Sequence, residues 1–256
     1  EVAMDEAERF GYSLAIRLTR WDAARRLECV KRDQSSGADG VLLAGELGDD
    51  ADPFYRELRR RNYPLLTFCC PNVLGFSSLT GEGGTALAEA VRFLAGAGHR
   101  RILFGAYGQG GSSQGYAAAF AVACRELGVE AETVFNQSVG EAAELAQRRD
   151  LPPAVILFGK YSLQAFLEER RRFRHPLPAL VGFYDEWTWA GAPQQELAGV
   201  IFSSPENALR AAVRQLIGEI DRREEPRQLV FPMTFVPRAG FGALPAKDFY
   251  NHVFFW

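Results

Sequence analysis

Short apolar runs alternate with amphipathic segments along nearly the whole chain, and this alternation restricts the fold more than any other feature. Between the runs, Leu87, Val91 and Leu94 recur at the spacing of one helix face, and a second apolar stripe extends from Leu209 to Ile220. Such alternation is typical of parallel βαβ units. The sequence therefore predicts an α/β fold, with strands at residues 13–18, 40–44, 64–69, 101–105, 132–135, 154–158, 178–183, 199–202 and 229–236.

Glycine, serine and proline mark the ends of the two predicted helices that carry these stripes. Gly96 and Gly98 follow the first stripe and predict the end of its helix. Ser203 or Ser204 stands before Pro205 and predicts an N-cap followed by proline in the first turn of the second helix.

Composition excludes several classes of protein. The formal net charge of −3 argues against a nucleic-acid-binding surface on this chain, because duplex binding needs clustered Lys and Arg. No apolar run approaches the ~20 residues of a membrane span, and the first residues are too acidic for a signal peptide. We expect no contact with membranes.

Cysteine usage predicts reduced thiols and a cytoplasmic protein. The four cysteines show no Cys-x-x-Cys spacing, and two of them are adjacent, which prevents an ordinary disulfide between them: Cys29, Cys69, Cys70 and Cys124. Only three histidines are present, and none has metal-ligand spacing with a cysteine: His99, His175 and His252. We therefore expect no metal and no cofactor.

Several short motifs occur in a fixed order along the chain. They are Gly40–Ala44, Tyr63–Phe68, Gly98–Phe104, Gly115–Phe120, Leu180–Phe183 and Phe235–Arg238. In this order and at these distances they resemble the effector-binding core of the lactose-repressor/galactose-repressor (LacI/GalR) family of bacterial transcription regulators. The resemblance covers roughly residues 1–240, and its specificity comes from the co-occurrence of motifs that are individually weak.

The resemblance implies two Rossmann-like, doubly wound parallel-sheet subdomains joined by three crossovers, a clamshell of the type I periplasmic-binding-protein class. The N-terminal subdomain would comprise residues 1–79 and 203–227, and the C-terminal subdomain residues 80–202 and 228–241. An aromatic tail, residues 242–256, would dock on the body, on a sister subunit or at the mouth of the cleft, because free tails seldom expose so many rings. A ligand would bind between the carboxyl ends of both sets of strands.

Family members carry an amino-terminal helix-turn-helix that reads an operator as a dimer. Such a head is absent from this sequence, so the resemblance implies a homodimer that senses a small-molecule effector and contacts DNA only through an upstream segment. Ala3 to Phe10 predicts the last turns of a helix that ends at Gly11, with no strand before it. Since the family's first strand lies mid-sheet, we expect further residues upstream of Glu1.

The expected cleft departs from that of sugar-binding relatives, which usually place an Arg, an Asn-Asp pair and two acidic residues there. Four positions differ: Ser112, Gly159 with Lys160, Tyr184 and Cys69. A neutral sugar is therefore not expected. Asp185, Trp187 and Trp189 remain, and with Lys160 they suit a ligand that has a flat face and an anionic group. The ligand-binding candidates are Cys69, Ser112, Gly159, Lys160, Tyr184, Asp185 and Trp187.

Other interpretations of these segments stay open. Trp187 and Trp189 could pack on the core, Lys160 could be solvated, and the cleft could have lost sensing altogether. The glycine-rich stretch 105–113 lacks the lysine of a phosphate-binding loop, although its amides could hold an anionic effector. The charged run 168–174 predicts a solvated helix face.

Two alternative functions differ in class from a regulator. Residues 111–115 match the Gly-x-Ser-x-Gly elbow of hydrolases, with Asp185 and His252 in the proper order, but several residues separate Ser113 from the strand end at Gly105. No catalytic residue is therefore assigned, and we predict a protein that is not an enzyme. A periplasmic solute (sugar)-binding protein of the same fold is the remaining alternative, disfavoured by the unpaired cysteines.

Overall fold

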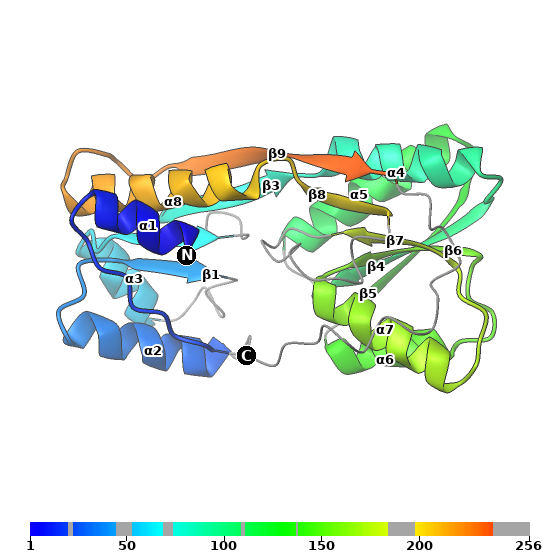
Figure 1. The fold of residues 1–256 in the computed structure, drawn as a ribbon, viewed down its shortest axis with the longest axis horizontal. Helices are drawn as coiled ribbons and strands as arrows, with labels where there is room; N and C mark the ends of the chain where they lie inside the picture. Colours follow the sequence, from blue (N-terminus) through cyan, green and yellow to red (C-terminus); the bar gives the residue numbers. More distant parts are fainter. Residues whose placement is uncertain are drawn as a thin grey trace. The chain divides into compact units, whose positions relative to one another are not determined.

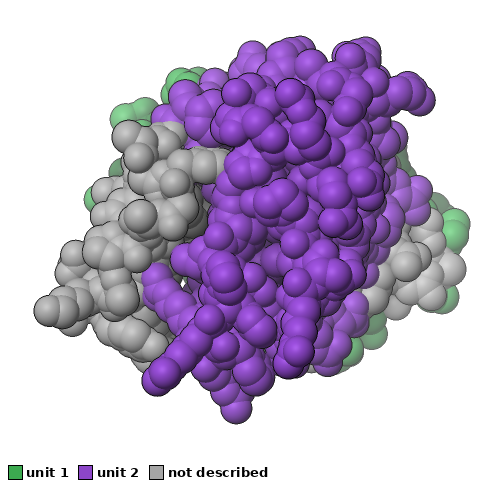
Figure 2. All heavy atoms as spheres, turned by 90° about the vertical axis from the view of Figure 1, so that its right-hand side faces the viewer, with its two compact units in different colours: residues 1–81, 204–231 green, residues 82–203, 232–256 purple. Residues whose placement is uncertain are grey.

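The computed structural model describes residues 1–19, 23–44, 53–68, 74–108, 111–136, 138–183 and 198–237. The chain divides into two compact units (Figure 2): unit 1, residues 1–81 and 204–231, and unit 2, residues 82–203 and 232–256. In each unit, helices cover both faces of a group of strands (Figure 1). The predicted α/β fold class, with mostly parallel strands, is confirmed.

Unit 1 is built on three parallel strands, β1 (Val41–Ala44), β2 (Leu65–Phe68) and β3 (Ser77–Glu82), paired in that order. Helices α1 (Val2–Arg9) and α8 (Pro205–Ile220) lie on one side of these strands, and α2 (Ala23–Ser35) and α3 (Pro53–Arg60) lie on the other (Figure 1). The core between the strands, α2 and α3 is formed by Val30, Leu43, Tyr55, Leu58, Leu65 and Phe76.

Unit 2 has five parallel strands in the order β5-β4-β6-β7-β8, and a sixth, β9, antiparallel to β8. Helices α4 and α5 lie on one side of these strands, and α6 and α7 on the other (Figure 1). The elements are β4 (Arg101–Tyr107), β5 (Glu130–Asn136), β6 (Ala154–Phe158), β7 (Ala179–Phe183), β8 (Ala198–Phe202), β9 (Gln228–Val236), α4 (Gly84–Gly96), α5 (Gly111–Glu126), α6 (Val139–Gln147) and α7 (Lys160–Arg172).

The predicted helix ends are confirmed at three places. Helix α4 ends at Gly96, and Gly98 has a φ of +93°, which lets the backbone N–H of His99 donate to the carbonyl of Leu94 at 3.1 Å. Ser204 is the N-cap residue of α8, with Pro205 in its first turn. Helix α1 ends before Gly11, whose φ is +80°.

The strand prediction was wrong at two places. Residues 13–18 form no strand, and the side chains of Ile16 and Leu18 are 61% and 66% exposed. Residues 77–82, which we did not predict as a strand, form β3. Ser77 and Ser78 are fully buried, and the Ser77 hydroxyl donates to Glu219 and accepts the N–H of Arg227 at 2.9 Å. This pairing lets Ser77 occupy a buried strand, whereas the Ser78 hydroxyl has no hydrogen-bond partner among the described residues.

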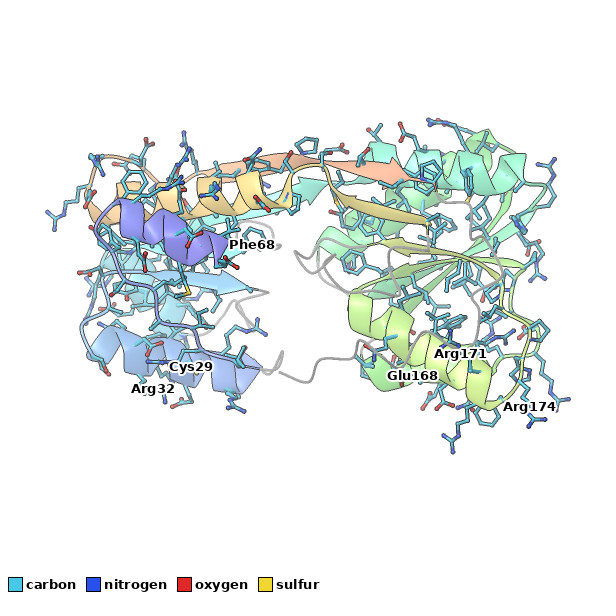
Figure 3. All side chains as sticks on the ribbon, viewed as in Figure 1. Cys29, Arg32, Phe68, Glu168, Arg171 and Arg174 are labelled. Carbon is cyan, nitrogen blue, oxygen red and sulfur yellow. The ribbon has the colours of Figure 1, made fainter. Side chains whose placement is uncertain are left out.

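The prediction of a solvated helix face for residues 168–174 was only partly right. Glu168 of α7 and Arg174, just after α7, are exposed, whereas Arg171 is half-buried (Figure 3). Arg170, in contrast, is 6% exposed and donates to the backbone carbonyls of Ala146 (3.0 Å), Arg148 (3.2 Å) and Pro176. Its guanidinium provides the several donors that this junction needs, so it fixes α7 against α6.

Candidate functional site

The carboxyl ends of the unit 2 strands bring several sequence-predicted residues to one edge of the sheet. Because β4, β6 and β7 are parallel neighbours, the segments that follow them leave the sheet on the same side. Ser112 lies in the first turn of α5, which follows β4, while Gly159 and Lys160 connect β6 to α7. The structure therefore places these three backbone positions at the same edge.

Gly159 occupies a backbone conformation that favours glycine. Its φ is +89° and its ψ is 133°, and it is the N-cap residue of α7. Its N–H donates to the carbonyl of Phe183 at 2.9 Å, and its carbonyl accepts the N–H of Leu163 at 3.1 Å. The residue thus ties the end of β7 to the start of α7 without placing a side chain at the edge.

Three aromatic rings form a layer beneath this edge. The ring centroids of Tyr116 and Phe183 are 4.6 Å apart, those of Phe158 and Phe183 5.2 Å, and those of Tyr116 and Phe158 5.7 Å. A Cβ on Gly83 would lie only 2.7 Å from the Cζ of Phe183, so the packing requires glycine there. We call these three residues the aromatic floor. Phe158 and Phe183 were missed as site residues, although each ends an apolar run in the sequence.

Asn136, the last residue of β5, is also at this edge and was missed as a site residue. It is 1% exposed, and among the described residues its Nδ2 has no hydrogen-bond partner. A Cβ on Gly105 would lie 3.4 Å from this Nδ2 and 3.7 Å from Leu145, so the amide lies on the side of the sheet that α6 covers. A buried amide without an acceptor is costly and is a natural contact for a ligand.

Comparison of this chain with known proteins identifies the fold. No family model and no curated protein matches the sequence. Among solved structures, the Cra transcriptional dual regulator from Pseudomonas putida, in complex with fructose 1-phosphate, is 19% identical with a TM-score of 0.77, covering 93% of this chain and 91% of that chain. A LacI family transcriptional regulator from Bifidobacterium animalis subsp. lactis is 21% identical with a TM-score of 0.70, covering 94% and 92%. This chain has the core fold of LacI-family regulators. The trehalose repressor from Escherichia coli is also similar, at 17% identity and a TM-score of 0.70, covering 92% and 91%.

Within this LacI-family fold, the remaining predicted site residues lie outside the described ranges: Cys69, Tyr184, Asp185 and Trp187. The same holds for the tail, residues 242–256. Their contribution to a site therefore stays a prediction.

The hydrolase-like motif does not form a nucleophile elbow in this LacI-family fold. Ser113 lies within the first turn of α5, where it is 4% exposed, whereas an elbow serine projects from a tight turn at the strand end. Strand β4 continues to Tyr107, and Gly108 donates its N–H to the carbonyl of Asn136 at 2.7 Å.

Thiols, metal ligands and membrane helices add little to the site. Among the described cysteines, Cys29 and Cys124 are free, and burial raises the pKa of the Cys124 thiol to about 11. Cys29 lies one turn before Arg32 on α2 (Figure 3). The guanidinium of Arg32 donates a hydrogen bond to the Sγ of Cys29 at 3.7 Å. In the described ranges we find no cluster of three metal-ligating side chains. None of the described helices is long and apolar enough to cross a membrane.

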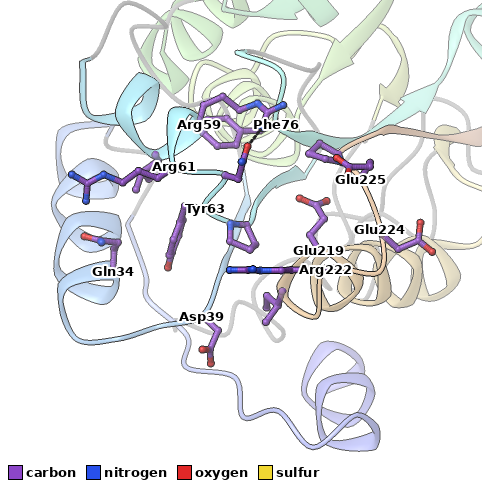
Figure 4. A pocket seen from close by; sticks show the side chains of 15 residues that line it. Gln34, Asp39, Arg59, Arg61, Tyr63, Phe76, Glu219, Arg222, Glu224 and Glu225 are labelled. Atoms are coloured by element: carbon purple, nitrogen blue, oxygen red, sulfur yellow. Dashed lines mark hydrogen bonds between the residues drawn. The ribbon is translucent and has the colours of Figure 1, made fainter.

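A separate hollow of about 640 Å³ lies in unit 1 (Figure 4). It is at the amino ends of β1 to β3, because Pro64 and Phe76 directly precede β2 and β3. Both signs of charge line it, from Asp39, Arg59, Arg61, Glu219, Arg222, Glu224 and Glu225. Burial and nearby Asp39 raise the pKa of Tyr63 to about 12, and its hydroxyl donates to the carbonyl of Ala38. None of the sequence-predicted site residues lines this hollow.

Proposed function

We propose that this chain is the effector-sensing and dimerisation core of a bacterial LacI/GalR-type transcription regulator in the cytoplasm. A small metabolite binds at the carboxyl edge of unit 2 and controls operator binding by a DNA-binding head elsewhere in the protein. The observation that carries the proposal is the carboxyl edge of the unit 2 strands in a regulator fold, which has the aromatic floor on its α5 side and the unpaired amide of Asn136 and the start of α7 on its α6 side.

Regulation of operator binding requires no catalysis in this mechanism. A ligand that binds one conformation of the core more tightly than another shifts the population toward the favoured one. If the two conformations hold the DNA-binding heads differently, operator affinity changes by the same free energy, which in allosteric proteins typically corresponds to about 5- to 150-fold.

The ligand class follows from the fold neighbours and from the residues at the edge. Because similar regulators are described with fructose 1-phosphate and as a trehalose repressor, we assign a carbohydrate-derived metabolite. Ser112, Gly159 and Lys160 stand where sugar-binding relatives carry guanidinium, amide and carboxylate groups, so a neutral sugar would lack charged partners for its hydroxyls. The aromatic floor instead provides an apolar base for the ligand.

Thermal unfolding in the presence of defined compounds tests the proposal. We expect fructose 1-phosphate, rather than the neutral sugars fructose and trehalose, to raise the Tm of the chain, because a ligand that binds only the folded state stabilises it. The variant Asn136→Leu should unfold no earlier than the parent without ligand, since it removes an unpaired buried amide, but should lose most of the ligand-induced rise.

Gln164→Leu is the matched control. This amide donates to Glu168 along the surface of α7, so its loss should leave the ligand-induced rise in Tm unchanged. If none of the three compounds raises the Tm of the parent chain, or if Asn136→Leu keeps the full rise, the assignment of effector binding to this edge is wrong.

A further inference from the structure

The amino-terminal end of α7 has no internal cap. Gly159, its N-cap residue, has no side chain to accept a hydrogen bond, and the first turn contains no acidic residue. The N–H of Leu163 is the first to bond back to Gly159. The three amides before it, at positions 160 to 162, have no acceptor within the helix and carry the positive end of its dipole.

Three other helix starts are capped or carry an acidic group, whereas the first turns of α2, α3 and α5 also lack an acidic residue. The hydroxyl of Ser138 accepts the N–H of Glu141 at the start of α6. Glu82 accepts the N–H of Gly84 at the start of α4, and Glu206 lies in the first turn of α8. At the opposite end of α7, three arginines in the last turn complement the dipole. The positive end of α7 is therefore left without a balancing negative group among the described residues.

Ser162 adds a buried donor that points to the same place. Its side chain is 2% exposed, and within the described part of the chain its hydroxyl has no hydrogen-bond partner. Its Oγ lies 3.7 Å from the position that a Cβ on Gly159 would occupy, so the hydroxyl is directed at the N-cap residue. Asn136 contributes a second unpaired donor on the same side of the sheet. The edge thus offers O–H and N–H donors and lacks an acceptor for them.

The geometry points to an oxyanion-binding subsite at the start of α7, formed by the amides of residues 160–162 and the Ser162 hydroxyl. It would hold a phosphate or carboxylate group of the effector. Backbone amides at a helix start bind such groups because the donors converge and the dipole favours negative charge. This inference rests on the proposed function and narrows its ligand class to anionic metabolites.

Amide NMR of the whole chain tests the subsite directly. Inorganic phosphate and acetate, each titrated at constant ionic strength, should shift the amide signals of residues 160–162 saturably, and the tighter of the two identifies the preferred group. Ser162→Ala should weaken this binding by about tenfold, the effect of losing one hydrogen bond to a charged group. Ser162→Asp should raise the Tm and abolish the response, because the introduced carboxylate supplies the missing charge.

Ser138→Ala serves as the matched control, since that hydroxyl already caps α6, and it should leave anion affinity unchanged. Two outcomes overturn the inference: no saturable shift at residues 160–162 with either anion, or unchanged affinity in both Ser162 variants. A neutral compound that raises the Tm while neither anion shifts these amides refutes the subsite but leaves the proposed function intact. If no compound and no anion binds, both fail.

Discussion

At the scale of single residues, Gly159 contributes its backbone conformation. A φ of +89° with a ψ of 133° strains any residue that has a Cβ, even though the nearest atom to such a Cβ, the Oγ of Ser162, is 3.7 Å away. The space around Gly159 would accept a methyl group, whereas the backbone would not. The sequence identified this position as a departure from its relatives, but residue type alone does not encode φ.

We expect Gly159→Ala to lower the free energy of unfolding by about 1 to 3 kcal/mol, the cost of that strain. Chemical denaturation measures the change. Gly115→Ala is the control, because Gly115 lies inside α5 with nothing within 4 Å of a new Cβ, and it should raise the free energy by up to about 1 kcal/mol. Equal shifts in the two variants would contradict the argument from strain.

At the scale of elements, the two junctions between helices depend on buried charges. Glu6 of α1 is 1% exposed and accepts from Arg214 at 2.5 Å and from Arg210 at 2.8 Å, both on α8. Hydrogen bonds from these two guanidinium groups lower the pKa of Glu6 below its ordinary 4.5. The carboxylate therefore stabilises the folded chain above that ordinary pKa, and the contribution is lost as the pH falls through the lowered value.

Glu6→Gln should reduce the free energy of unfolding at neutral pH by about 2 kcal/mol, because two guanidinium groups lose their shared acceptor. The loss should shrink as the pH falls from 4.5 through the lowered pKa of Glu6, because the unfolded parent is protonated first and the folded parent only at the lower pH. Denaturation curves at several pH values measure both effects. Glu8→Gln, an exposed position on the same helix, should change little, and a pH-independent loss in Glu6→Gln would refute the role of the charge.

Arg170 has the corresponding role between α7 and α6. Arg170→Ala should cost about 3 kcal/mol of unfolding free energy, since it leaves three carbonyls without their donor. Arg172→Ala, which removes an exposed pair with Glu169, should cost less than about 0.5 kcal/mol. Thermal or chemical unfolding distinguishes them, and similar losses would show that burial of Arg170 is unimportant.

Strands were predicted correctly where an apolar run pairs with a neighbouring strand. They were predicted wrongly where the pattern of polar and apolar residues did not reflect strand pairing. Residues 154–158 were predicted without error because all five are buried aliphatic or aromatic residues. Residues 13–18 show the side-chain alternation expected of a strand. Alternation indicates only which side chains share a face, and a strand also needs a neighbouring strand to pair with. β3 was missed because the pair Ser77 and Ser78 is typical of a turn, and the hydrogen bonds that accommodate the buried Ser77 side chain cannot be read from the sequence. Asn136 was missed because a polar residue at a strand end is expected to be exposed, and its burial cannot be read from the sequence.

At the scale of the whole molecule, four exposed apolar side chains lie within the first 18 residues of unit 1. Met4, Phe10, Ile16 and Leu18 are 39% to 66% exposed. Such residues are normally covered, so we assign this segment to the proposed homodimer. Ile16→Asp combined with Leu18→Asp should convert the protein to a monomer in light scattering. Val122→Asp, at a 41% exposed position on α5, should leave the dimer intact, and a monomeric parent would refute the assignment.

The chain order of unit 1 has a consequence for synthesis. Its last helix, α8, carries Arg210, which pairs with Glu6 across 204 residues of sequence. Ribosomes add about 5 to 20 residues per second, so about 10 to 40 s separate the emergence of the two partners. During that interval the carboxylate has left the ribosome without its guanidinium groups, while residues 82–203 of unit 2 are made between them. Nascent α1 must therefore wait until α8 has been made before it can dock, and chaperones have that window in which to hold it.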